Sequence, residues 1–254
     1  MSGFHTHALY RHEHSVLHEL PAQVKVTALF LFVAAVVATP REAFLAFGFE
    51  AALLVAALVV ARIPIGFVAR RLVIEIPFLV FAVLMPFLSG GSRTSVLGVS
   101  LSIAGLWGAW TILAKGTLGL GASVLMAATT EIPDILEGLE RLRVPRLMTA
   151  IAGFMVRYLD VIAGELRRMR VAMSARGYDP RWVGQVGPMA ASAGALFVRS
   201  YERGERVHRA MLARGYTGTM PASNAVPATS RDWLVGLTVP ILAWVGAVVA
   251  LVLR

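Results

Sequence analysis

Five apolar runs separated by polar segments dominate the pattern of this chain. They lie at residues 26–39, 43–61, 72–88, 99–127 and 233–253. Because an α-helix rises about 1.5 Å per residue, about 20 apolar residues are needed to cross a hydrocarbon core of about 30 Å. The run at 26–39 is shorter, so we expect the bilayer to thin around it or the helix to extend into its flanks. The pattern predicts an all-α membrane protein with about five transmembrane helices.

The polar connections carry unequal numbers of arginines. The 62–71 loop holds three arginines and the 128–232 block holds 15 of the 24 Lys and Arg residues, whereas the turns at 40–42 and 89–95 hold one each. With five spans, the two arginine-rich segments lie on the same side of the membrane. The positive-inside rule then predicts a cytoplasmic N-terminus, a cytoplasmic 128–232 block and an external Arg254.

These segments divide the chain into three parts. Residues 1–127 hold a polar tail and the first four transmembrane helices, residues 128–232 form a cytoplasmic region, and residues 233–254 form the last transmembrane helix. The tail at 1–25 has no apolar run of signal-peptide length, so we expect no cleavable signal peptide. A linker at 217–231, with Pro, Ser, Thr and Asn, precedes the last span.

The cytoplasmic region has a helical pattern but carries too much charge to span a membrane. Thr130 can cap a helix whose first turn holds Glu131 and Asp134, and Pro145 ends or kinks that helix. Two further helices each carry a stripe on one face: Ile162, Leu166, Met169 and Met173 on the first, and Arg199, Arg203 and Arg206 on the second. We expect amphipathic helices that lie along or beneath the membrane surface.

One short motif occurs twice in this region. The segment AMSARGY at 172–178 returns as AMLARGY at 210–216, with six of the seven positions identical. A glycine directly after a helix takes the left-handed conformation without a Cβ clash, and an arginine near that end suits the negative pole of the helix. Arg176 and Arg214 then project past the helix ends as forks of five donors. Capping alone explains one copy, but two copies indicate two similar partners.

Ionisable residues near the apolar runs are further candidates for function. Glu75 lies four residues after Arg71 and can pair with it, while Lys115 either packs against another helix or breaks the fourth run into two segments. Pro77 and Pro86 predict kinks in the third span. We predict no transport pathway through this chain.

Other kinds of chemistry find little support in the sequence. His12, His14 and His18 have ligand-like spacing, but histidines are ordinary at a membrane interface, and we predict no metal site and no cofactor. The chain has no cysteine, which excludes disulfides and thiol chemistry. The net charge of +9 is mixed with acidic residues and lacks stacking aromatics, so we predict no nucleic-acid binding. The sequence contains no Walker-type phosphate loop, HExxH or GxSxG motif, so we predict no enzymatic activity.

The repeated motif carries a family resemblance. Its core residues are Ala175, Arg176 and Gly177 in the first copy and Ala213, Arg214 and Gly215 in the second. They resemble the paired Ala-Arg-Gly motifs of the transmembrane T component of energy-coupling factor (ECF) transporters. Residues 14–25 and 139–145 are similar to that family as well, and residues 197–215 most resemble its cobalt-transport, CbiQ-like branch. The resemblance covers most of the chain.

The resemblance implies a non-catalytic coupling subunit for cobalt uptake, embedded in the lipid bilayer of a bacterial inner membrane. Two ABC-type ATPases would lie beneath it in the cytoplasm, and each Ala-Arg-Gly helix end would dock in a groove of one ATPase. Arg176 and Arg214 would bond to acidic groups there. ATP-driven closure would move the coupling helices and reshape a separate substrate-binding S component, CbiM-like. Nickel or a vitamin such as biotin is the alternative cargo.

Two classes outside transport coupling are also open. A membrane enzyme that acts on a phosphorylated or lipid substrate needs Asp/His pairs at the membrane face, whereas Asp134, Asp160 and Asp179 are scattered along the chain. A self-sufficient permease or channel would have inverted repeats of membrane spans. The repeat in this chain lies in the 128–232 block.

Overall fold

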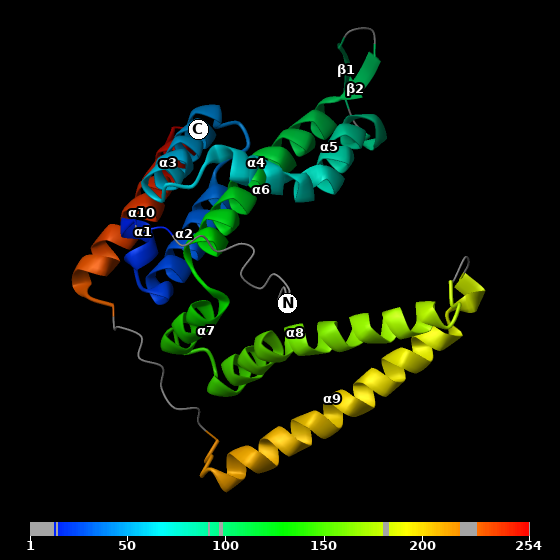
Figure 1. Ribbon diagram of the computed structural model, residues 1–254. Coiled ribbons are helices and arrows are strands. Elements are labelled where there is room, and N and C mark those ends of the chain that lie inside the picture. The colour runs from blue at the N-terminus through cyan, green and yellow to red at the C-terminus, as the bar shows by residue number, and fades with distance from the viewer. Residues whose placement is uncertain are drawn as a thin grey trace. The chain divides into compact units, whose positions relative to one another are not determined.

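The computed structural model describes residues 13, 15–90, 92–96, 99–179, 183–218 and 228–253. The chain forms two compact units (Figure 1). We call the first the membrane unit, which comprises Leu9–Leu142 and Ala225–Arg254, and the second the two-helix unit, which comprises Met1–Ala8 and Arg143–Asn224.

Helices account for most of the described residues in both units. The membrane unit contains α1 (Val16–Glu19), α2 (Ala22–Ala38), α3 (Phe44–Val60), α4 (Ile65–Arg71), a 3-10 helix (Leu72–Glu75), α5 (Ile76–Leu88), β1 (Arg93–Val96), β2 (Val99–Ser102), α6 (Ile103–Thr129), α7 (Ile132–Arg141) and α10 (Ser230–Val252). The two-helix unit contains α8 (Arg146–Ala175), a 3-10 helix (Val183–Gln185) and α9 (Gly187–Ala213). The predicted all-α membrane fold is confirmed.

The five predicted apolar runs correspond to α2, α3, the 3-10 helix Leu72–Glu75 with α5, α6 and α10, whereas α4 lies in the segment predicted as the 62–71 loop. Gly66–Leu88, α6 and α10 are long and apolar enough to cross a membrane, whereas α2 and α3 are apolar helices of 17 residues each. Helix α8 is also long and apolar enough to cross a membrane. We had expected the helices of the 128–232 block to carry too much charge for that. Helix α8 differs because most of its charged residues lie in its C-terminal half.

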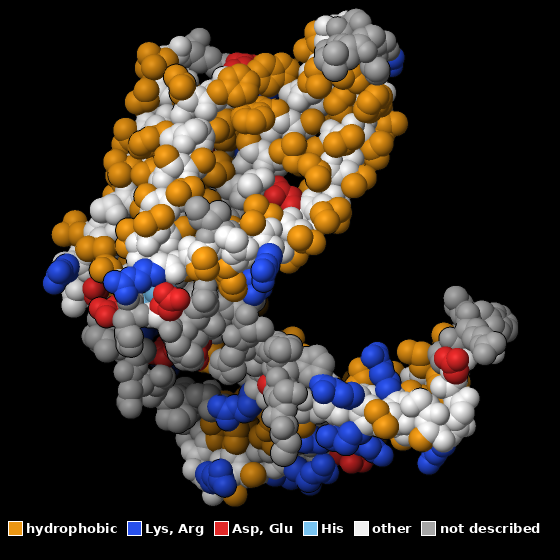
Figure 2. Space-filling model, turned by 45° about the horizontal axis from the view of Figure 1, so that its top comes forward, with side chains coloured by type: hydrophobic (Ala, Val, Ile, Leu, Met, Phe, Trp, Pro, Cys, Tyr) orange, Lys and Arg blue, Asp and Glu red, His pale blue; other side chains and the backbone are white. Residues whose placement is uncertain are grey.

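The exposed surface of the membrane unit is rich in apolar side chains (Figure 2). Large hydrophobic residues such as Phe78 on α5 and Val245 on α10 are more than half exposed, at 60% and 55%. An aqueous surface rarely carries an apolar area of this extent. A surface in contact with lipid tails accounts for it.

The segment between α5 and α6 differs from the prediction. Strands β1 and β2 pair antiparallel, with Arg93 opposite Ser102 and Val96 opposite Val99, whereas we expected a turn followed directly by the fourth span. Helix α6 therefore starts at Ile103, where the Ser102 hydroxyl accepts a bond from the Gly105 amide. Lys115 does not break this helix, which is continuous to Thr129.

The predicted cap of α7 was also wrong. The N-cap residue is Glu131 rather than Thr130, and its side chain makes no capping bond. A proline at the second position of this helix supplies a backbone suited to a helix start, because its missing N–H would have no partner there. Thr130 instead caps the C-terminal end of α6.

Neighbouring helices in the membrane unit have defined directions. Trp244 on α10 donates to the Leu31 carbonyl on α2, and Gly236 of α10 lies against Val24 of α2. The residue numbers of the contacting positions increase in the same direction along both helices, so α2 and α10 run parallel (Figure 1). Helix α6 runs antiparallel to α2, because its end at Thr129 lies beside the start of α2. The beginnings of α2 and α10 and the end of α6 therefore lie at one end of the unit, as a five-span path requires.

Two lysines join α2 and α6 reciprocally. Lys25 at the start of α2 donates to the Thr129 carbonyl at the end of α6, at 2.9 Å. Lys115 in α6 donates to the Val37 carbonyl at the end of α2, at 2.6 Å. Each ammonium group therefore lies at the negative end of the other helix. Of the two alternatives for Lys115, the structure shows packing against a neighbouring helix.

Candidate functional site

The two Ala-Arg-Gly motifs adopt the same backbone conformation. The helices α8 and α9 end at the motif alanines, and the arginines are the C-cap residues, with φ, ψ of −93°, 14° at Arg176 and −94°, 10° at Arg214. The glycines follow in the left-handed region, with φ of 78° at Gly177 and 83° at Gly215. The predicted left-handed glycine after each helix is confirmed.

The hydrogen bonds at the two ends match as well. The Gly177 amide donates to the Ser174 carbonyl at 3.0 Å, and the Tyr178 amide reaches back to the Met173 carbonyl at 3.1 Å. The equivalent bonds of the second copy, from Gly215 to Leu212 and from Tyr216 to Met211, are both 3.0 Å. This pair of bonds is the Schellman motif, which satisfies the last carbonyls of a helix. The repeat in sequence is therefore a repeat in three dimensions.

The burial pattern repeats as well. In each copy the Met and Tyr side chains are half-buried, whereas the Ala, Arg and Gly residues are exposed. Within the described part of the chain, neither Arg176 nor Arg214 makes a side-chain hydrogen bond or ion pair. A Cβ at Gly177 or Gly215 would meet nothing within 4 Å, so the backbone angle and not space requires glycine. Each helix end thus presents an available guanidinium group beside small residues.

Helix α9 separates the two motifs. The first motif precedes α9, and the Tyr178 hydroxyl donates to the Gln185 carbonyl just before that helix begins. The second motif ends α9, which has 27 residues and is therefore about 40 Å long. Figure 1 shows the two motifs at opposite ends of α9. Such a spacing suits two separate protein partners better than one small ligand.

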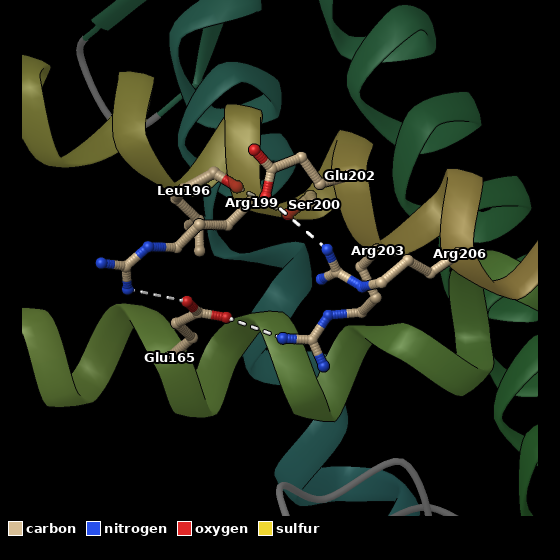
Figure 3. Close-up of polar contacts among 7 residues, drawn as sticks. All are labelled: Glu165, Leu196, Arg199, Ser200, Glu202, Arg203 and Arg206. Atoms are coloured by element: carbon tan, nitrogen blue, oxygen red, sulfur yellow. Dashed lines mark hydrogen bonds and ion pairs between the residues drawn. The ribbon is translucent and has the colours of Figure 1, made fainter.

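The two helices are joined by an ion-pair cluster (Figure 3). Glu165 of α8 accepts from Arg199 at 3.1 Å and from Arg203 at 3.2 Å. The predicted arginine stripe is thus partly directed towards α8, while Arg206 pairs with Glu202 in its own helix at 3.7 Å. The predicted apolar stripe on α8 is half-buried along its whole length.

A polar pocket of about 260 Å³ lies at the α1, α2 and α7 end of the membrane unit. Lys25 enters it and donates to the His18 carbonyl at 3.0 Å, in addition to the Thr129 carbonyl. Asp134 on α7 faces the same pocket. Partial burial, followed by two neighbouring glutamates, raises the pKa of Asp134 above its usual value, and the positive charge of Lys25 opposes this rise.

Glu50 is a buried carboxylate that our sequence reasoning missed. It lies in α3 with 0% of its surface exposed, and its Oε1 accepts from the Thr39 hydroxyl at 2.7 Å. Its Oε2 has no hydrogen-bond partner among the described residues. The sequence did contain a signal for Glu50, because it interrupts the apolar run 43–61 just as Glu75 interrupts the run 72–88 near its start. Glu75 accepts from Thr117 on α6.

The metal hypothesis rested on the N-terminal histidines. His12 and His14 lie outside the described residues, whereas the His18 Nδ1 atom lies 2.7 Å from the Ser15 hydroxyl. No group of three or more His, Cys, Asp or Glu side chains suited to a metal ion occurs in the described ranges.

These features define a class: a multi-pass membrane protein that presents two equivalent, arginine-bearing helix ends about one long helix apart. The chain belongs to the CbiQ family, described as cobalt transport protein, whose model matches residues 13–224. That match includes both Ala-Arg-Gly motifs and every described helix except α10.

Named relatives place the family within transport. The chain is 28% identical to the cobalt transport protein CbiQ of Rhodobacter capsulatus over 173 residues, which are 67% of this chain and 68% of that protein. It is 28% identical to the energy-coupling factor transporter transmembrane protein EcfT of Bacillus selenitireducens over 222 residues, 80% of this chain and 81% of the relative. Over 138 residues, half of this chain and 48% of the relative, it is 28% identical to the nickel permease LarQ of Lactiplantibacillus plantarum. The chain is accordingly a multi-pass membrane component of a transporter.

Proposed function

We propose that this chain is the energy-coupling T component of an ECF-type transporter for cobalt. The observation that carries the proposal is the matched pair of exposed helix ends, each closed by a Schellman motif and each carrying one available arginine, Arg176 or Arg214. Membership of the CbiQ family and similarity to a protein named EcfT support it.

Each helix end would bind one of two ABC-type ATPases. A guanidinium group offers paired donors to a carboxylate, and such charge-assisted bonds are strong when they are shielded from water. The exposed alanine and glycine beside each arginine allow a partner surface to approach closely. Ala175, Gly177, Ala213 and Gly215 therefore belong to the proposed docking site together with the two arginines.

The ATP-driven movement would pass along α8 and α9 to a substrate-binding membrane subunit. A CbiM-like S component is the proposed recipient, and a relative named as a putative fused cobalt transport protein CbiMQ supports this partner. That protein, from Methanocorpusculum labreanum, is 26% identical over 134 residues, which are 53% of this chain and 22% of the relative. Under this proposal the chain itself performs no catalysis.

Cobalt is the proposed cargo, because the family model and the Rhodobacter capsulatus relative both carry that name. Nickel is the second candidate, supported by the similarity to LarQ. The positive-inside rule supports an inner-membrane orientation with the N-terminus and the two-helix unit in the cytoplasm.

The decisive experiment is co-purification with the two candidate ATPases. The double variant Arg176→Glu/Arg214→Glu should lose the ATPases and cobalt uptake, because like charges would face each other in both docking grooves. Arg209→Glu is the matched control, since Arg209 is an exposed arginine of α9 outside the motif that pairs only within its helix. Complex formation and transport that survive in the double variant would overturn the proposal.

A further inference from the structure

Glu165 occupies an unusual position in the two-helix unit. Its side chain is 12% exposed, whereas those of Arg199 and Arg203 are 60% and 38% exposed. Each carboxylate oxygen receives one arginine, Oε1 from Arg199 and Oε2 from Arg203 (Figure 3). A buried charge with its partners removed is unfavourable, so the carboxylate has a strong preference for this arrangement of α9.

The other ion pairs of α9 differ in kind. Arg206 with Glu202 and Arg209 with Glu205 are spaced i, i+4 within one helix, and all four side chains are at least 45% exposed. Exposed pairs of this type contribute little, because water screens them and their side chains lose entropy. The Glu165 cluster instead links residues 34 and 38 positions apart in the chain.

Two ion pairs on successive turns of α9 restrict its movement relative to α8 more than a single ion pair can. A single ion pair would leave α9 free to rotate about its axis and to swing about one point. Arg199 and Arg203 lie i, i+4 on one face, on either side of the centre of α9 (Gly187–Ala213), so keeping both bonds fixes its rotation as well as its distance from α8.

Packing between the two helices supplies little of this constraint. None of the residues of α9 is buried, and in α8 only Thr149 and Glu165 are. The half-buried face of α9 near the cluster holds apolar Leu196 and Val207 beside polar Ser200, and none of these side chains is fully buried. The Ser192 hydroxyl contacts the Met173 sulfur at 3.4 Å, close to the connection between the helices.

We propose that Glu165 is a positioning residue that makes α8 and α9 one rigid body and thereby sets the separation of Arg176 and Arg214. This inference rests on the proposed function, since the two arginines are the ATPase-docking groups. With the cluster intact, movement of either docking end is transmitted to the other. Without it, each helix end follows its own ATPase, and ATP hydrolysis is no longer converted efficiently into transport.

The absence of native cysteines makes the inference directly measurable. Spin labels at Ala172→Cys and Ala210→Cys, exposed positions three residues before the Ala-Arg-Gly cores, report the separation of the helix ends by pulsed electron paramagnetic resonance on the full chain in nanodiscs. Glu165→Gln should broaden this distance distribution. Glu205→Gln, which removes the same charge from an exposed pair, should leave it unchanged.

Two further variants separate positioning from misfolding. Arg199→Gln/Arg203→Gln removes the same link from its exposed side and should broaden the distribution equally. The mirrored cluster Glu165→Arg/Arg199→Glu/Arg203→Glu exchanges the charges between the two helices, so it should restore the narrow distance distribution. A distribution that stays narrow in Glu165→Gln, or a mirrored cluster that folds and stays broad, overturns the inference.

The complete transporter supplies the functional measurement. Glu165→Gln should still bind both ATPases, because the motifs are intact, but should transport about tenfold less substrate per ATP hydrolysed, a typical size for coupling between sites. Normal coupling in this variant contradicts the inference. Loss of ATPase binding only in Arg176→Glu/Arg214→Glu supports the proposed function independently, and the label distances test Glu165 even if that docking proposal fails.

Discussion

The membrane unit and the two-helix unit are stabilised by different interactions. In the membrane unit, apolar side chains such as Phe32, Phe47 and Leu58 form a buried cluster, and glycines bring helices into close contact. In the two-helix unit, a buried carboxylate and two capped helix ends carry most of the specific contacts. The contrast indicates that the membrane unit is tightly packed, whereas α8 and α9 of the two-helix unit are sparsely packed. The following substitutions test it.

The largest effect is expected where backbones nearly touch. A Cβ at Gly105 would lie 2.6 Å from both the Met85 carbonyl oxygen and the Pro86 Cα, and these backbone atoms cannot rotate away. Gly105→Ala should therefore destabilise the membrane unit by about 3 kcal/mol, measured as a lower Tm in detergent. Gly204→Ala in α9 has open space around it and should be neutral or stabilising by up to about 1 kcal/mol. Equal effects of the two substitutions would contradict the contrast.

Substitution of Lys25 tests how much the hydrogen bonds between α2 and α6 stabilise the membrane unit. Lys25→Met leaves the His18 and Thr129 carbonyls without their ammonium donor, and the loss should be about 2 kcal/mol in unfolding free energy. The control is Arg209→Met on α9, whose exposed pair with Glu205 should contribute less than about 0.5 kcal/mol. A Tm of Lys25→Met equal to that of the control would show that the reciprocal lysines do not fasten α2 to α6.

A substitution at one of the capped helix ends should destabilise that end locally and leave the membrane unit unaffected. Gly177→Ala forces a Cβ into a backbone with φ of 78°, at a cost of about 1 kcal/mol. We expect faster amide hydrogen exchange over the last turn of α8, with little change in the Tm of the membrane unit. Gly194→Ala, in the interior of α9, is the control that should not accelerate exchange. Unchanged protection in Gly177→Ala would argue against a strained left-handed cap.

The smallest effect concerns pH. Because the pKa of Asp134 is raised in the folded protein, folding favours its protonated form. The associated stability is present below the unfolded pKa and is lost as the pH rises through the higher folded value. Wild-type Tm should therefore fall slightly as the pH increases above about 4, and Asp134→Asn should flatten that slope. Glu140→Gln on the same helix is the control, and a slope that persists in Asp134→Asn would assign it to another group.

Much of the fold followed from patterns of short range. The apolar runs located the helices because a membrane span must satisfy its backbone bonds within one segment. The glycines at 177 and 215 located two helix ends because the left-handed backbone penalises a Cβ. The pairing of β1 with β2 and the cap of α7 were mispredicted, since short polar segments satisfy several local conformations and neighbouring contacts select among them.

The polar contacts between helices illustrate the opposite case. Lys115 was recognised as anomalous, but its partner, the Val37 carbonyl, lies 78 residues away in the chain. The stripe with Arg199 and Arg203 was visible too, yet nothing in its spacing indicated that both residues meet Glu165. Glu50 became notable only through its complete burial.

Local rules were therefore sufficient to place helices in the five apolar runs, to predict the two matching arginine ends and to reveal the resemblance to a transporter component. Those properties depend on residues within a few turns of one another. The reciprocal lysines, the buried Glu50 and the Glu165 cluster depend on which helices become neighbours and in what register. Register is set by the summed packing of many side chains distant in sequence, so these contacts emerged only once the helices were assembled.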